Sequence, residues 1–156
     1  MEATPHKLIS ISDIVREVVA GVGAMAEETP VELKCDVTED PCSLMGDAVQ
    51  ITRAIQNVII NAIQASGDRK GTVEVSCIRK DFYVDVRIAD TGQGISPEQI
   101  ARIFDPYFTT KQGKSGTGLG LFITRKVVDD HNGSIKADST PGIGTTITIR
   151  LPLINN

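Results

Sequence analysis

Hydrophobic residues repeat at helical spacing in the segment 51–66. The apolar positions there are Ile51, Ala54, Ile55, Val58, Ile59, Ala62 and Ile63. Residues three and four positions apart share one face of an α-helix, so the pattern predicts an amphipathic helix over residues 47–66. Similar spacing predicts helices over 13–25 and 119–130, and Pro97 starts a short helix that we expect to end at residue 103.

Other segments alternate between apolar and polar residues, which is the pattern of a half-buried strand. Between residues 82 and 89, Val84, Val86 and Ile88 alternate with polar neighbours. Together with a turn over 67–71, this predicts a hairpin of strands 72–79 and 82–89. Further strands are expected over 31–37, 133–138 and 145–151, and the last two form a second hairpin.

These elements predict an α+β fold built as a two-layer α/β sandwich. Strands with one apolar face need a cover, and the predicted helices carry the complementary apolar faces. We therefore expect a mixed, mostly antiparallel sheet with helices on one side.

Composition agrees with one globular domain and narrows the classes of function. The 156 residues are 40% hydrophobic and 23% charged, which is ordinary for such a domain. No apolar run approaches the roughly 20 residues that would span a membrane, and no secretory signal opens the chain. We therefore expect a cytoplasmic location and no membrane segment. A net charge of −4 without a basic cluster argues against nucleic-acid binding.

The three cysteines do not predict a metal site. Cys35, Cys42 and Cys77 are odd in number and lack the spacing of metal ligands, so we expect reduced, largely buried thiols.

Two asparagines supply the first candidate chemistry. Asn57 and Asn61 lie four residues apart and share one face of the predicted helix. A carboxamide oxygen suits Mg²⁺, which takes its remaining oxygens from water and substrate phosphates. Asn61 is our metal candidate. An asparagine pair alone is more often a solvated helix face, but the neighbouring motifs favour the metal hypothesis.

The second motif is Asp90-x-Gly92-x-Gly94, at the end of the predicted strand 82–89. A carboxylate there can accept a hydrogen bond from an exocyclic amine, which adenine carries and guanine lacks at the equivalent edge. Gly92 and Gly94 let the backbone pass close to a flat base. Asp-x-Gly is also ordinary turn chemistry, so the motif alone is not specific.

A segment without a clear period runs from residue 104 to 115 and is typical of a mobile lid. Phe104, Tyr107 and Phe108 give it an aromatic start. Lys111 and Lys114 suit phosphate contacts as point charges, although lysines in loops are commonly only solvated. We favour Lys111.

A glycine-rich run, residues 116–121, precedes the last predicted helix. Glycines at a helix start make an anion site, because free backbone N–H groups and the helix dipole both favour phosphate. A P-loop is excluded, since it requires a glycine where Phe108 stands. A dinucleotide fingerprint is excluded too, because polar residues 109–115 replace the apolar strand that should precede the glycines.

Together these motifs resemble the catalytic and ATP-binding domain of bacterial sensor histidine kinases, in the superfamily of the gyrase, Hsp90 and MutL ATPase domains. The N box corresponds to residues 56–65, the G1 box to 90–95, the F box to 104–108 and the G2 box to 116–121. The tail from His131 to Pro152 is similar to the family's closing helix and hairpin. The F box Phe-Asp-Pro-Tyr-Phe-Thr-Thr-Lys looks most like that of the nitrogen-regulation and oxygen-sensing kinases.

The resemblance implies a Bergerat ATP-binding fold and a pocket for ATP and Mg²⁺ between the Asn57 helix and the lid. Asp90 would hold the adenine amino group, Asn61 would coordinate Mg²⁺ and Thr145 would lie near the base. Asn57 and Lys111 are the implied catalytic residues. The expected nucleotide-binding residues are Asn57, Asn61, Gln64, Ala65, Asp90, Gly92, Gly94, Ile95, Phe104, Lys111, Gly116, Thr117, Gly118, Leu119, Gly120, Leu121 and Thr145.

The chain departs from the family pattern at two positions. Many relatives have a basic residue where Gln64 stands and an arginine where Thr109 stands. Phosphate neutralisation would then depend more on Lys111 and on helix-end amides.

Asn57 separates kinases from hydrolases within the superfamily. Hydrolases place a glutamate there to activate water, whereas a carboxamide cannot accept a proton at neutral pH. We therefore expect phosphoryl transfer to a histidine rather than rapid ATP hydrolysis. A non-catalytic ATP- or ADP-binding partner module and a weak ATPase are the alternatives.

The histidine acceptor is not evident in this chain. His6 and His131 are its only histidines, and neither lies in a helical hairpin with a following acidic residue. The resemblance implies a separate dimerisation hairpin as partner, a response regulator as an indirect partner and, for the whole protein, a place in a membrane-associated kinase. Residues 1–12 resemble the family's linker and 13–153 its catalytic domain.

Overall fold

The computed structural model describes residues 6–108 and 120–154, and the description below concerns these residues. Its helices are α1 (Ile11–Glu27), α2 (Ala48–Ala65), α3 (Pro97–Ile100) and α4 (Gly120–Asp130). Its strands are β1 (Lys7–Ser10), β2 (Val31–Val37), β3 (Ser43–Gly46), β4 (Gly71–Arg79), β5 (Tyr83–Asp90), β6 (Ser134–Thr140) and β7 (Gly144–Pro152).

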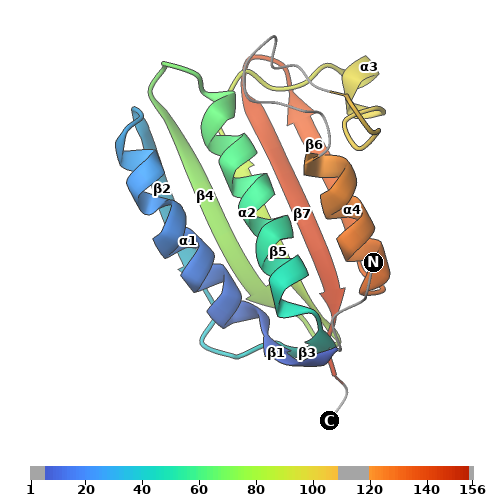
Figure 1. Cartoon of the computed structure of the whole chain (residues 1–156). Helices are drawn as coiled ribbons and strands as arrows, with labels where there is room; N and C mark the ends of the chain where they lie inside the picture. The colour runs from blue at the N-terminus through green and yellow to red at the C-terminus, as the bar shows by residue number, and fades with distance from the viewer. Residues whose placement is uncertain (1–5, 109–119, 155–156) are drawn as a thin grey trace.

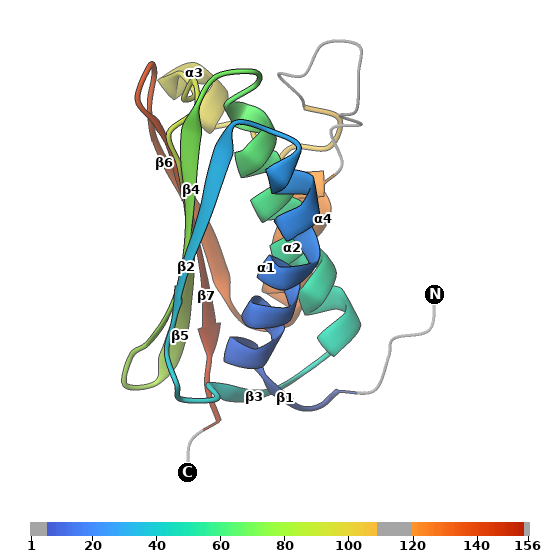
Figure 2. The same cartoon turned by 90° about the vertical axis from the view of Figure 1, so that its left-hand side faces the viewer.

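Five strands form one twisted sheet in the order β2-β4-β5-β7-β6 (Figure 1). Only β2 and β4 are parallel, and the other three pairings are antiparallel. Helices α1, α2 and α4 cover one face of this sheet, and among the described residues none of these helices lies on the opposite face (Figure 2). The expected two-layer α+β sandwich with a mixed, mostly antiparallel sheet is confirmed.

Helix α2 is the central element of the helical layer. Its side chain at the N-cap, Asp47, accepts hydrogen bonds from the backbone N–H groups of Val49 and Gln50, which satisfies two donors that have no partner inside the helix. The apolar face that the sequence predicts is the buried face. Its members are Ile51, Ala54, Ile55, Val58, Ile59, Ala62 and Ile63.

Inward residues of the strands complete the core. Val84, Val86 and Ile88 on β5 are at most 1% exposed, as the alternation of that segment predicts. Because the side chains of a strand alternate in direction, Asp90 follows the same inward series and ends it beneath the helical layer. This position separates Asp90 from the charged residues on the open face.

Some expectations were wrong in extent. Helix α3 ends at Ile100, three residues earlier than predicted. The short strands β1 and β3 were not predicted, and they pair with each other antiparallel below α1 and α2 (Figure 1). Cys42 and Cys77 are buried as expected, whereas Cys35 is exposed.

The helices in the described part of the chain include none with the length and apolarity that a membrane crossing requires.

Candidate functional site

Asp90 and Thr145 are the centre of the candidate site. They are direct partners in the antiparallel pairing of β5 with β7. Asp90 Oδ1 accepts a hydrogen bond from Gly92 N–H at 2.8 Å and a longer one from Thr145 N–H at 3.3 Å. Both bonds use the same oxygen, so an incoming donor would meet Oδ2.

Two opposing effects act on the ionisation of Asp90. Burial, the larger effect, raises the pKa of the carboxyl group, and the two backbone hydrogen bonds from Gly92 and Thr145 lower it. The net result is a pKa above the ordinary value of 3.8. Carboxylates that accept backbone hydrogen bonds and are poorly solvated are common in binding sites, where a ligand donates a further hydrogen bond to them.

Close backbone contacts explain the two glycines of the Asp90 motif. A Cβ at Gly92 would lie 2.7 Å from the Ala65 carbonyl oxygen at the end of α2. Gly94 has φ +74° and faces the Thr140 carbonyl oxygen too closely for any side chain. These contacts hold the loop after β5 against α2 and the β6–β7 turn. Backbone packing alone therefore explains why glycine occupies both positions, without a bound base. Their close approach to a base stays a prediction.

The polar edge of α2 runs past this loop. Asn57, Asn61, Gln64 and Ala65 are all half-buried, and Asn61 and Gln64 each interact with other residues. The spacing places them along one side of the helix, ending at Ala65, whose carbonyl oxygen accepts from Gln93 N–H at 3.3 Å. The structure therefore brings the Asn57 and Asp90 motifs to one region.

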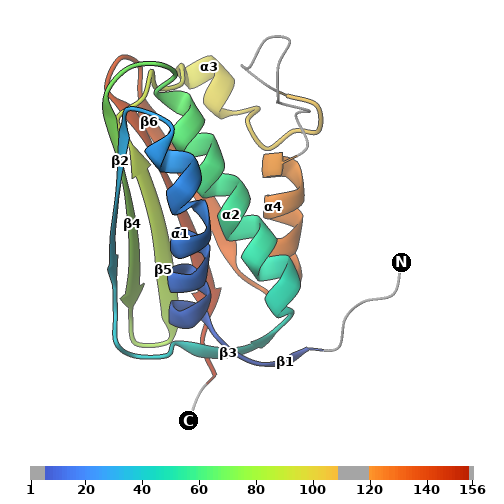
Figure 3. The ribbon, with the colours of Figure 1, turned by 60° about the vertical axis from the view of Figure 1, so that its left-hand side comes forward.

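Helix α4 lies beside α2 (Figure 3). Its first residue, Gly120, is close to Asn57: a Cβ on Gly120 would lie 3.9 Å from Asn57 Cγ. The Thr124 hydroxyl donates to the Gly120 carbonyl oxygen at 2.8 Å and closes the first turn. The N-terminal end of α4 thus faces the asparagine edge of α2, which is where a helix dipole would favour an anion.

The aromatic segment contacts the same helix. The Arg125 guanidinium of α4 lies over the half-buried Phe104 ring, 5.7 Å from its centroid. Arg102 lies 5.4 Å from the centroid of the Phe108 ring. Tyr107, between them, is 74% exposed. Phe104 is therefore near the site but packs toward α4.

Several predicted site residues lie outside the described residues. They are Lys111, Gly116, Thr117, Gly118 and Leu119. Gly120 and Leu121 are described and form the start of α4. Ile95 lies after the glycine motif and is half-buried.

Ser139 is a residue that the sequence did not single out. Its hydroxyl contacts the Ile95 N–H and the Thr145 hydroxyl, at 2.7 and 2.8 Å. A serine in a strand of alternating pattern gives no signal of such a role, because its partner Ile95 is 44 residues away in the chain.

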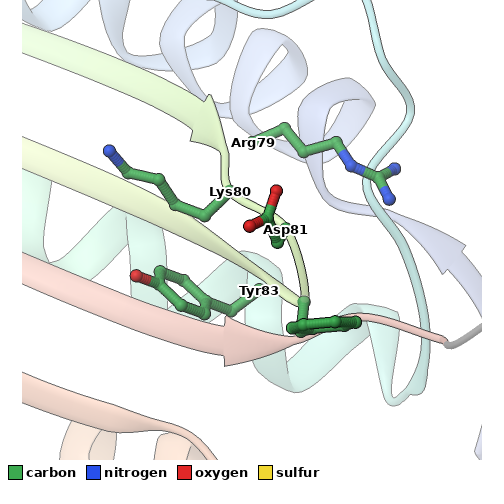
Figure 4. Close-up of a pocket in the computed structure, with 5 residues that line it drawn as sticks. Arg79, Lys80, Asp81 and Tyr83 are labelled. Atoms are coloured by element: carbon green, nitrogen blue, oxygen red, sulfur yellow. The ribbon is translucent and has the colours of Figure 1, made fainter.

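A separate pocket lies at the turn between β4 and β5 (Figure 4). It is lined by Arg79, Lys80, Asp81, Phe82 and Tyr83. Tyr83 begins the strand that Asp90 ends, so this pocket and the Asp90 site are at opposite ends of β5.

Within the described residues, no group of three or more histidine, cysteine or acidic side chains is arranged to hold a metal ion.

Residues 46–155 match the family described as Histidine kinase-, DNA gyrase B-, and HSP90-like ATPase. Over 149 residues the chain is 35% identical to the sensor histidine kinase ZraS of Salmonella typhimurium (strain LT2), a match that covers 94% of this chain and 31% of ZraS. The chain thus spans about a third of the length of this curated relative.

Solved structures share the fold. The mycobacterial sensor histidine kinase MprB is 28% identical with a TM-score of 0.83, over 97% of this chain and 99% of that one. Full-length ShkA in complex with AMPPNP is 24% identical with a TM-score of 0.85, over 100% of this chain and 32% of that one, and at this identity the likeness shows the fold alone. With the family match spanning both the Asp90 and the Asn57 motifs, the chain belongs to the histidine kinase-, DNA gyrase B-, and HSP90-like ATPase family.

Proposed function

We propose that this chain is the catalytic domain of a sensor histidine kinase, which binds Mg-ATP and donates the γ-phosphoryl group to a histidine on a dimerisation hairpin outside the chain. The observation that supports this most is the half-buried Asp90 carboxylate beneath the helical layer, with two backbone N–H groups on one oxygen. Family membership and the homology to ZraS support the same function.

Asp90 would select the adenine base through its second oxygen. An exocyclic amine donates a charge-assisted hydrogen bond to a carboxylate, while a carbonyl oxygen at the same edge would be repelled. Thr145 pairs with Asp90 and Ala65 adjoins Gly92, and both would line the base. ShkA, which shares the fold, was solved in complex with AMPPNP, an adenine nucleotide analogue.

Asn57 and Asn61 would serve the phosphate end. Their amide oxygens are hard, neutral ligands on one side of α2, which suits a metal that takes its remaining oxygens from water and phosphate. Mg²⁺, when bound, would neutralise charge on the phosphates. We assign Asn61 to the metal and Asn57 to the adjacent phosphate region, close to Gly120 at the start of α4.

The remaining phosphate contacts fall on residues that we propose from the sequence. These are Gln64, Lys111, Gly116, Thr117, Gly118, Leu119, Gly120 and Leu121. In transfer, a nitrogen of the acceptor histidine bonds to the γ-phosphorus as the bond to the ADP oxygen breaks. The domain needs to position the nucleotide and neutralise its phosphate charge rather than to supply a general base. Asn57 is not a general base.

An exposed apolar surface on α4 suits the acceptor hairpin. Phe122 is 37% exposed and Ile123 is 45% exposed, and Tyr107 lies on the aromatic segment that packs against the same helix. An amphipathic helical hairpin docked there would bring its histidine to the end of the phosphate chain, because α4 starts at that end.

We also propose a subfamily, domain bounds, an indirect partner and a location, which are more specific than family membership. The F box keeps its likeness to nitrogen-regulation and oxygen-sensing kinases, although the relatives named above bear other names. We retain residues 1–12 as a linker, here docked through β1, and 13–153 as the catalytic domain. A response regulator would be served indirectly, and a cytoplasmic location within a membrane-associated kinase fits this role.

The test is transfer in trans. The purified chain and a separate dimerisation hairpin from a sensor kinase are mixed with γ-labelled ATP and Mg²⁺. We expect acid-labile label on the hairpin histidine, and none with the Asp90→Asn chain or with a hairpin whose histidine is replaced by alanine. Steady phosphate release without any acceptor would instead indicate an ATPase, and nucleotide binding without transfer to any hairpin would indicate a partner module.

A further inference from the structure

Three polar side chains form a row across neighbouring strands at the Asp90 end of the sheet. Thr145 on β7 pairs with Asp90 on β5 and also with Ser139 on β6. Directly paired residues in antiparallel strands project to the same face. That face is the helix-covered one, because Ile88 and Ile147, two residues along the same strands, are buried.

The Ser139 hydroxyl makes three contacts in this row. It accepts a hydrogen bond from Ile95 N–H at 2.7 Å and donates one to the Gly144 carbonyl oxygen at 3.0 Å. Its third contact is with the Thr145 hydroxyl at 2.8 Å. A serine hydroxyl has one proton and two lone pairs, so three such contacts use its full capacity.

Either hydroxyl is placed to donate in the third contact, and proton accounting assigns the donor. A carbonyl oxygen carries no proton, so the Ser139 proton lies on the bond to Gly144. The proton between Ser139 and Thr145 must then come from Thr145. With its proton committed to Ser139, the Thr145 hydroxyl offers only lone pairs to its other neighbours.

We infer that Ser139 is a positioning residue that holds the Thr145 hydroxyl as an acceptor and thereby makes the site selective for a base edge that carries an amine. This inference rests on the proposed function, because it assigns specificity within that nucleotide site. Asp90 and Thr145 then both present acceptors. An adenine amine can donate to them, whereas the carbonyl of hypoxanthine meets lone pairs only.

The preference for ATP over ITP measures this effect. Removing the Ser139 hydroxyl frees the Thr145 proton, which can then turn toward a base carbonyl. In Ser139→Ala we expect the ratio of ATP to ITP affinities, measured by calorimetry, to fall by roughly two- to tenfold, the range of one neutral hydrogen bond. Ser134→Ala, an exposed serine on the same strand, should leave the ratio unchanged.

Two further sets of variants separate this role from a structural one. Ser139→Thr and Ser139→Val have the same shape and differ in the hydroxyl, so only the threonine variant should keep the wild-type ratio. In a Thr145→Val background, Ser139→Ala should no longer change the ratio, because its intermediary is gone. The comparison of Ser139→Thr with Ser139→Val also serves if Ser139→Ala folds poorly.

The outcomes are distinguishable. If wild-type protein binds neither nucleotide, the proposed function is wrong and the inference falls with it. If wild type prefers ATP but Ser139→Ala lowers ATP and ITP affinities equally, or still changes the ratio in the Thr145→Val background, the proposed function stands and the inference is overturned.

Discussion

At the scale of single residues, two opposing effects act on the Asp90 carboxyl group, as is common for a residue in a binding site. Its carboxyl group is buried enough for its pKa to rise, yet backbone N–H groups of Gly92 and Thr145 bind one of its oxygens. Such a group gains from a ligand that donates a further hydrogen bond. Folding has already removed part of the water around this carboxyl group, so ligand binding desolvates it less.

Replacing Asp90 with asparagine should weaken ATP binding while the fold persists. The asparagine oxygen can still accept from Gly92 and Thr145, but the charged bond to the base amine is lost, at a cost of roughly 1.5–3 kcal/mol. Calorimetry with ATP measures the affinity and circular dichroism checks the fold. An affinity within about twofold of wild type, less than about 0.5 kcal/mol, would remove Asp90 from the site.

The same variant gives a pH test. Because the folded-state pKa of Asp90 is raised above 3.8, the protonated carboxyl is favoured in the folded state. Its contribution to the free energy of unfolding is therefore present below pH 3.8 and is lost as pH rises through the raised pKa. Urea unfolding should show wild type gaining stability relative to Asp90→Asn on acidification through this window. A constant difference between the two proteins would contradict burial as the dominant cause.

Asn61 has a narrower role, in the metal dependence of binding. In Asn61→Ala we expect Mg²⁺ to strengthen ATP binding much less than in wild type, because the amide oxygen that would meet the metal is gone. Titrations with and without Mg²⁺ measure this. Gln56→Ala, an exposed position on the same helix, is the control. Undiminished Mg²⁺ dependence in Asn61→Ala would move the metal to other ligands.

At the scale of elements, periodicity predicted what depends on local pattern. The buried face of α2 was predicted residue by residue, because seven apolar positions between Ile51 and Ile63 leave one consistent orientation. Strands β1 and β3 have four residues each, too few for alternation to be seen. Their pairing arises from contact between distant segments, which no local pattern encodes.

In the candidate site, too, local features were predicted and contacts between distant segments were not. The motif around Asp90 was predicted because its residues are close in sequence. Ser139 was missed because its contacts join three separate segments, and the reason for Gly94 was missed because Thr140 lies across the fold. Whether the predicted residues hold ATP stays a prediction.

One side chain links α2 to α4 from below the site. His131 Nε2 accepts from Asp47 N–H at 3.0 Å, and its Nδ1 bonds the Val127 carbonyl oxygen at 2.7 Å. These contacts assign the ring proton to Nδ1, since a carbonyl can only accept. His131 is 7% exposed and stacks on the exposed His6 ring, with 5.0 Å between centroids. His131 thus joins the start of α2 to the end of α4 through two hydrogen bonds, which is a structural role and not that of a phosphate acceptor.

Replacing His131 with phenylalanine should destabilise the domain. The Asp47 N–H and Val127 carbonyl would lose their partners in the core, and each buried unsatisfied group costs roughly 1–3 kcal/mol. The free energy of unfolding in urea measures the loss. His6→Phe keeps an aromatic ring at the exposed position and is the control. Equal stability of both variants would contradict the linking role.

At the scale of the whole molecule, the two ends of the sheet have different chemistry. The Asp90 end gathers the motifs of the candidate site, while the other end holds the pocket of charged and aromatic residues at the β4–β5 turn. The helices of the described residues cover one face of the sheet, and Cys42 and Cys77 are buried while Cys35 on the edge strand β2 is exposed. Cysteine reactivity therefore reports on the intact fold.

Of the three thiols, only Cys35 should react with an alkylating reagent in the native protein. Cys35 is exposed, whereas burial raises the pKa of Cys42 and raises that of Cys77 to about 12. The thiolate is the reactive form, so both buried groups should be inert at neutral pH. Mass spectrometry should find one label before denaturation and three after it. Native labelling of Cys77 would contradict the placement of β4 in the core.

The most direct test of the central claim is calorimetric titration of the purified chain with ATP, ADP and GTP, each with and without Mg²⁺. The account predicts binding of both adenine nucleotides, strengthening of ATP binding by Mg²⁺, and much weaker binding of GTP, because Asp90 and Thr145 offer acceptors to the base. Absence of adenine-nucleotide binding, or equal affinity for GTP, would contradict it.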